Sequence, residues 1–227
     1  MIQLQTKFSR QVDEHNVLPE YPRPSLVRTS YLNLNGRWEC AFSKTPEIPL
    51  SFDLSILVPF SPECQLSGVS RQLKPGEYLW YRRTIPLAKP QQDKRILLHF
   101  GAADHTAEVF VNRISAVRHC GGYLPFSADI TDYLQEGDNE LIVRIQDESN
   151  TSWHARGKQS LKPGGMFYTA QSGLWQTVWM EAVHPEGLQS VQLLTDIDQQ
   201  QLVVRPRFYK EAGGKLQVTL KDNGKVV

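Results

Sequence analysis

Cysteine is scarce in this sequence, and the few cysteines lack the spacing of a metal site or a disulfide framework. The 227 residues include only 3 cysteines, Cys40, Cys64 and Cys120. An odd count without paired spacing argues against disulfide pairing and against a zinc ligand set. We therefore expect three reduced thiols that pack as small, partly buried residues.

The sequence also has no marked excess of positive or negative charge. Lys and Arg number 25 against 24 Asp and Glu, which gives a formal net charge of +1. Nucleic-acid binders and membrane-surface proteins usually carry a clear basic patch. No run of about 18 apolar residues occurs, and the first residues lack the apolar segment of a signal peptide. The sequence thus predicts no nucleic-acid partner, no membrane partner and a cytoplasmic location.

Motifs for common cofactors are missing as well. The chain has no P-loop, dinucleotide fingerprint, nucleophile elbow or zinc motif, and its 6 histidines do not cluster at ligand spacing. We therefore predict no cofactor and no metal ligand.

What the sequence does contain is alternation of apolar and polar residues with period 2, which indicates strands with one buried face. Glycine turns such as Gly137-Asp138-Asn139 separate these runs. Only residues 130–134 favour a helical turn, with Thr131 as its N-cap. We expect an all-β chain whose first part is a jelly-roll (galactose-binding-like) sandwich. The predicted strands cover residues 35–42, 80–87, 95–101, 107–112, 140–146 and 174–181.

A domain boundary is expected near His184-Pro185-Glu186-Gly187, which places the first domain at residues 1–186 and the second at 187–227. Three more alternating runs follow, at residues 190–197, 201–209 and 215–222. An immunoglobulin-like sandwich needs about seven strands and about 100 residues. The second domain is therefore interpreted as a truncated immunoglobulin-like sandwich, with the chain ending inside it.

Six ordered blocks resemble the N-terminal region of glycoside hydrolase family 2, which includes β-galactosidases, β-glucuronidases and β-mannosidases. Six blocks in the family's order are far more specific than one motif. The blocks are YPRPSLVRTSYLNLNGRWE (21–39), VPFSPECQLSGV (58–69), LWYRRTIPL (79–87), LHFGAADHTAEVFVN (98–112), GGYLPFSADITDYLQEGDNELIVRIQD (121–147), and RGKQ (156–159) followed by GMFYTAQSGLWQTVWME (165–181).

The resemblance implies a sugar-binding jelly roll, then an immunoglobulin-like domain, then a (β/α)8 barrel that carries the chemistry. Retaining enzymes of this kind use two carboxylates about 5–5.5 Å apart, and both would lie in that downstream barrel. The pair Asn139-Glu140 matches the family's acid/base pair only superficially, because it stands at a turn before a strand. We therefore predict no catalytic residue in this chain.

Three functions stay open from the sequence. In the first, the chain is the non-catalytic front of an enzyme that hydrolyses terminal β-linked sugars, with its own barrel and a carbohydrate substrate as partners. In the second, it is a free-standing carbohydrate-binding module. In the third, it is a structural domain that supports the barrel or builds a homo-oligomer.

Candidate substrate-binding residues stand in the loop before the last strand of the first domain. The resemblance places that loop over the mouth of the barrel, where an aromatic ring and several donors suit a sugar. A solvated surface loop is the alternative. Where some relatives have an aspartate that contacts sugar or a cation, this chain has Phe167, so that role is not transferred. The candidates in this loop are Trp153, Arg156, Lys158 and Gln159.

Two weaker candidates lie in the second block. Ser61 falls near a position that approaches substrate in some relatives, and Glu63 follows it, although two prolines equally favour a plain turn. Asp104 and His105 could form an acid–base couple, but hydrogen bonds from their side chains to the backbone of a turn are the expected role.

Arginines and tryptophans of the predicted strands are assigned structural roles. Arg82 and Arg83 are expected to pair with carboxylates on a sheet face. The tryptophans are expected to anchor a core or an interface, and they are Trp38, Trp175 and Trp179.

Overall fold

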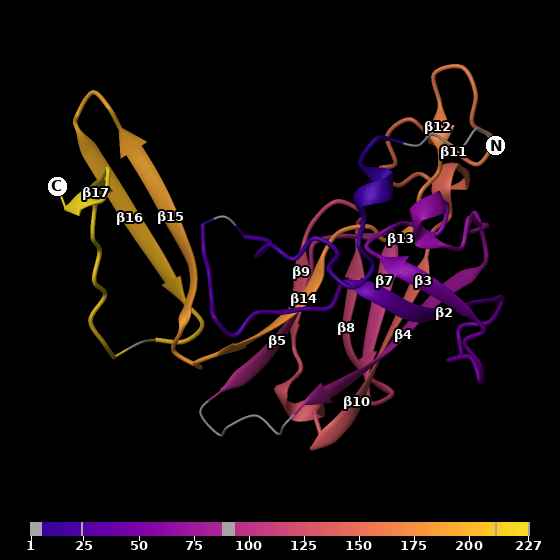
Figure 1. The fold of residues 1–227 in the computed structure, drawn as a ribbon, viewed down its shortest axis with the longest axis horizontal. Coiled ribbons are helices and arrows are strands. Elements are labelled where there is room, and N and C mark those ends of the chain that lie inside the picture. Colours follow the sequence, from indigo (N-terminus) through magenta and orange to yellow (C-terminus); the bar gives the residue numbers. More distant parts are fainter. Residues whose placement is uncertain (1–5, 24, 88–93, 212, 227) are drawn as a thin grey trace. The chain divides into compact units, whose positions relative to one another are not determined.

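The computed structural model describes residues 6–23, 25–87, 94–211 and 213–226, and it is almost entirely β (Figure 1). The chain divides into two compact units, Met1–Val183 and His184–Val227. No helix among the described residues has the length and apolar character needed to cross a membrane. The prediction of an all-β chain is confirmed.

The first unit is a sandwich of two sheets. One sheet has the strand order β1-β14-β5-β9, and the other has the order β3-β2-β4-β10-β7-β8. The strands of the first sheet are β1 (Leu32–Asn33), β14 (Val178–Val183), β5 (Arg95–Phe100) and β9 (Phe126–Asp129). Those of the second are β3 (Leu54–Val58), β2 (Gly36–Ser43), β4 (Tyr78–Leu87), β10 (Gly137–Gln146), β7 (Thr106–Val111) and β8 (Ile114–Cys120).

The core lies between these sheets because alternate residues of each strand point inward. Leu79 and Tyr81 of β4 belong to the main apolar cluster together with Leu98 of β5, whereas Trp80 joins Ile142 in a smaller cluster. Each buried side chain of this size stabilises the fold by about 1.5–3 kcal/mol relative to exposure.

Short elements position the loops around the sandwich. Two pairs of short strands lie outside the two main sheets. In one, β11 (Gln159–Ser160) pairs with β12 (Tyr168–Thr169), and in the other, β13 (Gly173–Leu174) pairs with β6 (Ala103–Asp104). The 3-10 turns are η1 (Ser9–Gln11), η2 (Gln65–Ser67), η3 (Thr131–Tyr133) and η4 (Ser149–Thr151).

The second unit contains two antiparallel pairs of strands. β15 (Leu188–Asp196) pairs with β16 (Gln201–Phe208), and β17 (Lys221–Asp222) pairs with β18 (Lys225–Val226). The strand predicted over residues 215–222 is wrong, since only its last two residues pair. Residues 213–220 begin with two glycines, have exposed side chains and find no partner strand among the described residues.

Two further local predictions hold in part. The helical turn predicted over residues 130–134 is present as the 3-10 turn η3, but Thr131 does not cap it. Its hydroxyl instead accepts a hydrogen bond from the backbone N–H of Ile96 at 2.8 Å. The strand expected over residues 174–181 is interrupted at residues 175–177, between β13 and β14.

The expectations for cysteine and arginine hold in part. The three cysteines are free thiols, but Cys120 is exposed rather than partly buried. Arg82 pairs with Glu39 as expected, with Nε 2.8 Å from Oε2. Arg83 meets no carboxylate of a described residue and donates to the backbone carbonyls of Leu34 and Asn35 instead.

Candidate functional site

The loop that follows β10 folds back over the end of the sandwich and begins with a buried aspartate. The carboxylate of Asp147 accepts a hydrogen bond from the backbone N–H of Ser149 at 2.7 Å, which starts the turn η4. His154 Nε2 lies 3.2 Å from Asp147 Oδ1, and both side chains are largely buried. This contact fixes the course of the loop.

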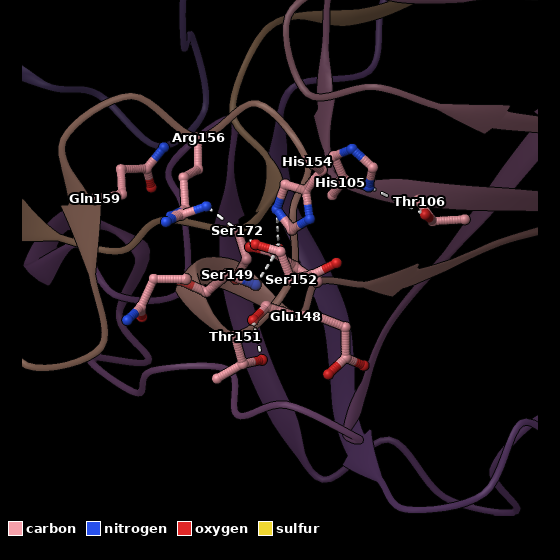
Figure 2. Close-up of polar contacts among 12 residues, drawn as sticks. His105, Thr106, Glu148, Ser149, Thr151, Ser152, His154, Arg156, Gln159 and Ser172 are labelled. Atoms are coloured by element: carbon pink, nitrogen blue, oxygen red, sulfur yellow. Dashed lines mark hydrogen bonds and ion pairs between the residues drawn. The ribbon is translucent and has the colours of Figure 1, made fainter.

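A pair of stacked histidines joins this loop to the residues that follow β6. The rings of His105 and His154 have centroids 4.0 Å apart and an interplanar angle of 28° (Figure 2). Burial lowers the pKa of His105, and the neighbouring His154 lowers it further. The His105 imidazole is therefore neutral near pH 7, which permits close stacking of the two rings.

Asp104 directly precedes His105, and its surroundings differ from those expected from the sequence. It is buried in β6, and its Oδ1 has no hydrogen-bond partner among the described residues. Burial raises the pKa of Asp104 to about 7, and the charge of Asp147 adds to the shift. The expected turn-fixing hydrogen bonds are not found in this part of the chain, so that prediction for Asp104 is wrong.

Gly122 makes the position of Asp104 possible. A Cβ atom at Gly122 would lie 2.3 Å from Asp104 Oδ1, so any side chain there would displace the Asp104 carboxyl group. The next residue, Tyr123, is half-exposed, and its hydroxyl accepts a hydrogen bond from Gln159 Nε2 at 3.4 Å. A carboxyl group, a phenol and an amide thus gather at one place and could contact the hydroxyl groups of a sugar.

The four loop residues predicted to bind substrate do not all point the same way. Gln159 reaches the cluster, and its Oε1 accepts a hydrogen bond from the backbone N–H of Gln171 at 2.6 Å. Arg156 turns back on its own loop and donates to the carbonyl of Ser152 at 3.0 Å. Trp153 is 95% exposed and Lys158 is exposed, so both are free to meet a ligand or another domain.

The two candidates from the second block are enclosed by the fold. Ser61 is buried, and Glu63 accepts hydrogen bonds from the backbone N–H of Leu73 and from both the N–H and the hydroxyl of Ser172. Burial raises the pKa of Glu63 to about 7, against the opposing effect of the Ser172 hydroxyl. Glu63 therefore joins two loops and lies near Asp104, whose pKa its charge raises slightly.

The cluster comes from four separate segments of the chain, and the sequence had singled out Glu63 and Gln159 as binding candidates; its members are Glu63, Asp104, His105, Tyr123, Asp147, His154 and Gln159. Sequence reasoning missed Asp147, His154 and Tyr123 as members and gave Asp104 another role. No group of three or more His, Cys, Asp or Glu side chains in the described part of the chain could hold a metal ion. Phe167 is half-exposed and supplies no ligand oxygen at its position.

Comparison with known proteins identifies the domain. Residues 71–182 match the family model described as the sugar binding domain of glycosyl hydrolases family 2. This segment is a family 2 sugar-binding domain. The resemblance noted in the sequence is thereby confirmed, and the match includes the cluster residues from Asp104 to Gln159.

Curated relatives of the family 2 domain are glycosidases. A β-glucuronidase of Felis catus is 27% identical over 245 residues, which cover 91% of this chain and 37% of the relative. A β-galactosidase of Bacteroides ovatus is 27% identical over 163 residues, covering 69% of this chain and 17% of the relative. The chain thus spans well under half the length of either relative.

Solved structures share the fold. A β-glucuronidase from Ruminococcus gnavus has a TM-score of 0.65 at 22% identity and is matched over 89% of this chain and 38% of its own. A β-glucuronidase of an uncultured Clostridium species has a TM-score of 0.61 at 22% identity, over 81% and 34% of the two chains. At these identities the likeness supports the fold alone.

Proposed function

We propose that this chain is the non-catalytic front part of a family 2 glycoside hydrolase that hydrolyses terminal β-linked sugars. The family match over residues 71–182 carries this proposal. The curated relatives include both β-galactosidases and β-glucuronidases, so the proposed substrate is a β-galactoside or a β-glucuronide. The reactive carboxylates of such an enzyme belong to a downstream barrel in the whole protein.

Within that enzyme, the loop over residues 153–172 shapes the rim of the active site. Trp153 offers an exposed aromatic face to the C–H surface of a sugar ring, and Gln159 and Tyr123 offer donors beside the carboxyl group of Asp104. The stacked pair of His105 and His154 holds the loop against β6, which keeps these groups together. Side chains that are already fixed lose less conformational freedom when a ligand binds.

The test is a kinetic comparison in the whole protein, with nitrophenyl β-D-galactoside and β-D-glucuronide as substrates. Trp153→Ala and Gln159→Ala should each raise KM several-fold while kcat changes less, because they remove contacts made with bound substrate. Lys162→Ala is the matched control, since Lys162 is an exposed residue of the same loop. Unchanged KM in both loop variants would remove the loop from the active site.

The same substrates test the non-catalytic role of this region. Residues 1–227 alone should give no turnover of either glycoside. Measurable turnover by this chain would contradict the proposal, whereas tight sugar binding by it without turnover would favour a carbohydrate-binding module.

A further inference from the structure

The segment between β10 and β13, residues 147–172, is bounded by two residues with positive φ. They are Ser149, with a φ of +47°, and Gly173, with a φ of +84°. This backbone conformation is uncommon for a residue with a side chain, and the buried hydroxyl of Ser149 has no hydrogen-bond partner among the described residues. Hinges of moving loops are a few terminal residues that absorb changes in backbone angle. The segment therefore has a candidate hinge at each end, and both lie within the first unit.

Carboxyl groups attach this segment to the rest of the sandwich near both hinges. At its start, Asp147 accepts a hydrogen bond from the backbone N–H of Ser149 at 2.7 Å and contacts His154. At its end, Glu63 accepts from the N–H of Ser172 at 3.2 Å and from its hydroxyl at 2.8 Å. The position of the segment therefore depends on groups that titrate.

A third carboxyl group, that of Asp104 in β6, is enclosed without enough partners. Asp104 is 5% exposed, and its Oδ1 has no hydrogen-bond partner among the described residues. The carboxyl group packs against Gly122, and a hydrogen bond from Gln159 offsets only part of the effect of burial. An ionised carboxylate in this position is cut off from water, so its ionisation favours any movement that admits water.

The pKa shifts in the cluster set the direction in which pH acts. Burial raises the pKa of Asp104 to about 7, with a further contribution from the charge of Asp147, and burial raises the pKa of Glu63 to about 7. Such groups bind their protons more tightly in the closed segment, so they stabilise it at low pH and lose that effect as the pH rises through about 7. Burial lowers the pKa of His105, so His105 disfavours the closed form only on the acid side.

Titratable groups from each neighbouring element face these acids. Asp147, Glu63 and Tyr123 act on Asp104, so ionised Asp104 has two further acids beside it. Arg156 of the same segment donates to the carbonyl of Ser152. The remaining titratable groups around Asp147, His105 and Glu63 are Glu148, His154, His119 and Tyr81.

We propose that residues 147–172 form a hinged lid and that the carboxyl group of Asp104 is its latch, which is closed while protonated and released when it ionises. Release passes one proton from Asp104 to the solvent, and the open lid lets water hydrate the carboxylate. This regulation rests on the proposed function, because the lid carries Trp153 and Gln159 of the rim. Opening above neutral pH would withdraw both side chains from a substrate.

The experiment is amide hydrogen exchange of the 227-residue chain at pH 6.5 and pH 8.5. The reporters are the amides of Ala170, Gln171 and Ser172, which donate to the carbonyl of Ser160, to Gln159 and to Glu63. Each exchange rate is divided into that of an unstructured peptide at the same pH, which gives a protection factor.

These protection factors should fall about fourfold or more between the two pH values. That is the change for a carboxyl group whose pKa is about 7 in the closed lid and about 4 in the open one. They should also stay at least tenfold below those of the amides in β10, which would show that the lid opens without unfolding of the sandwich.

Variants assign the effect to the latch. Asp104→Asn keeps the size of the side chain but cannot ionise, so its fall should be at least twofold smaller than that of the natural chain. Asp104→Ser, which is smaller and neutral, serves if Asp104→Asn does not fold. Asp132→Asn is the matched control at an exposed aspartate, and it should show the full fall.

Three results would overturn the lid. They are a fall of less than twofold in the natural chain, an undiminished fall in Asp104→Asn, and protection of the lid equal to that of β10. None of these measurements uses a substrate, so the lid and the rim fail separately. Unchanged KM in Trp153→Ala and Gln159→Ala would remove the rim and leave the latch in place.

Discussion

Asp104 shows how one side chain acquires its chemistry from burial. The folded chain encloses its carboxyl group beside Gly122 and near two other acids, Glu63 and Asp147. Burial and the charge of Asp147 raise the pKa of Asp104 to about 7. Near neutral pH the group is therefore partly protonated and could both donate to and accept from a sugar hydroxyl.

This shift predicts a pH-dependent gain in stability for Asp104→Asn. An acid whose pKa is higher in the folded state binds its proton more tightly there, so it stabilises the fold at low pH. That stabilisation is lost as the pH rises through the folded pKa. The gain of the variant over the natural chain should be larger at pH 8 than at pH 5, by on the order of 2 kcal/mol. Chemical unfolding at the two pH values measures it.

The matched control for this prediction is Asp132→Asn, at an exposed aspartate of the turn η3. It should change the free energy of unfolding equally at both pH values. A gain for Asp104→Asn that is the same at pH 5 and pH 8 would mean that the carboxyl group ionises as easily in the folded chain as in the unfolded one.

Among the elements, the short strand β13 decides how the loop meets the sandwich. Gly173 adopts a φ of +84°, and a Cβ atom there would lie 2.2 Å from the hydroxyl of the buried Tyr81. That hydroxyl accepts a hydrogen bond from the backbone N–H of Leu174 at 3.2 Å. The chain passes so close to Tyr81 that only glycine fits, and this contact places β13 beside β6 and Asp104.

We expect Gly173→Ala to lower the free energy of unfolding by about 2–4 kcal/mol, because it adds both a clash and backbone strain. Thermal unfolding by circular dichroism measures the loss. Gly164→Ala is the control, since a Cβ atom at Gly164 of the same loop meets nothing within 4 Å. Equal stability of the two variants would show that the backbone at Gly173 can move away from Tyr81.

At the scale of the whole molecule, the two units differ in how they bury apolar side chains. Both hydrophobic clusters consist of residues from the first unit. In the second unit, Leu193, Ile197 and Leu202 are all exposed. Large exposed apolar side chains on paired strands favour association with another surface.

A chain shortened to end at Val183 should therefore keep its fold, since it retains both clusters. Its melting temperature should stay within about 2 °C of the first transition of the 227-residue chain. Differential scanning calorimetry tests this. Loss of a cooperative transition in the shortened chain would show that the first unit depends on residues after Val183.

The sequence by itself determined the all-β class, most strands of the sandwich and the family. Period-2 alternation and ordered motif blocks are local signals, so they can be read without knowing what packs against them. The same local view failed where a strand is interrupted, at residues 175–177, because the close approach of Gly101 to Gln176 that shapes this break is a tertiary contact.

Only the tertiary structure decided the site. Tyr21 and Glu181 are 160 residues apart yet share a hydrogen bond, and Asp104 lies near Asp147 and Gln159 only after both sheets have formed. Burial, unpaired donors and shifted pKa values depend on which distant segments enclose a group, since they measure what replaces water around it. The residue types were therefore visible in the sequence, and their chemistry came from the fold.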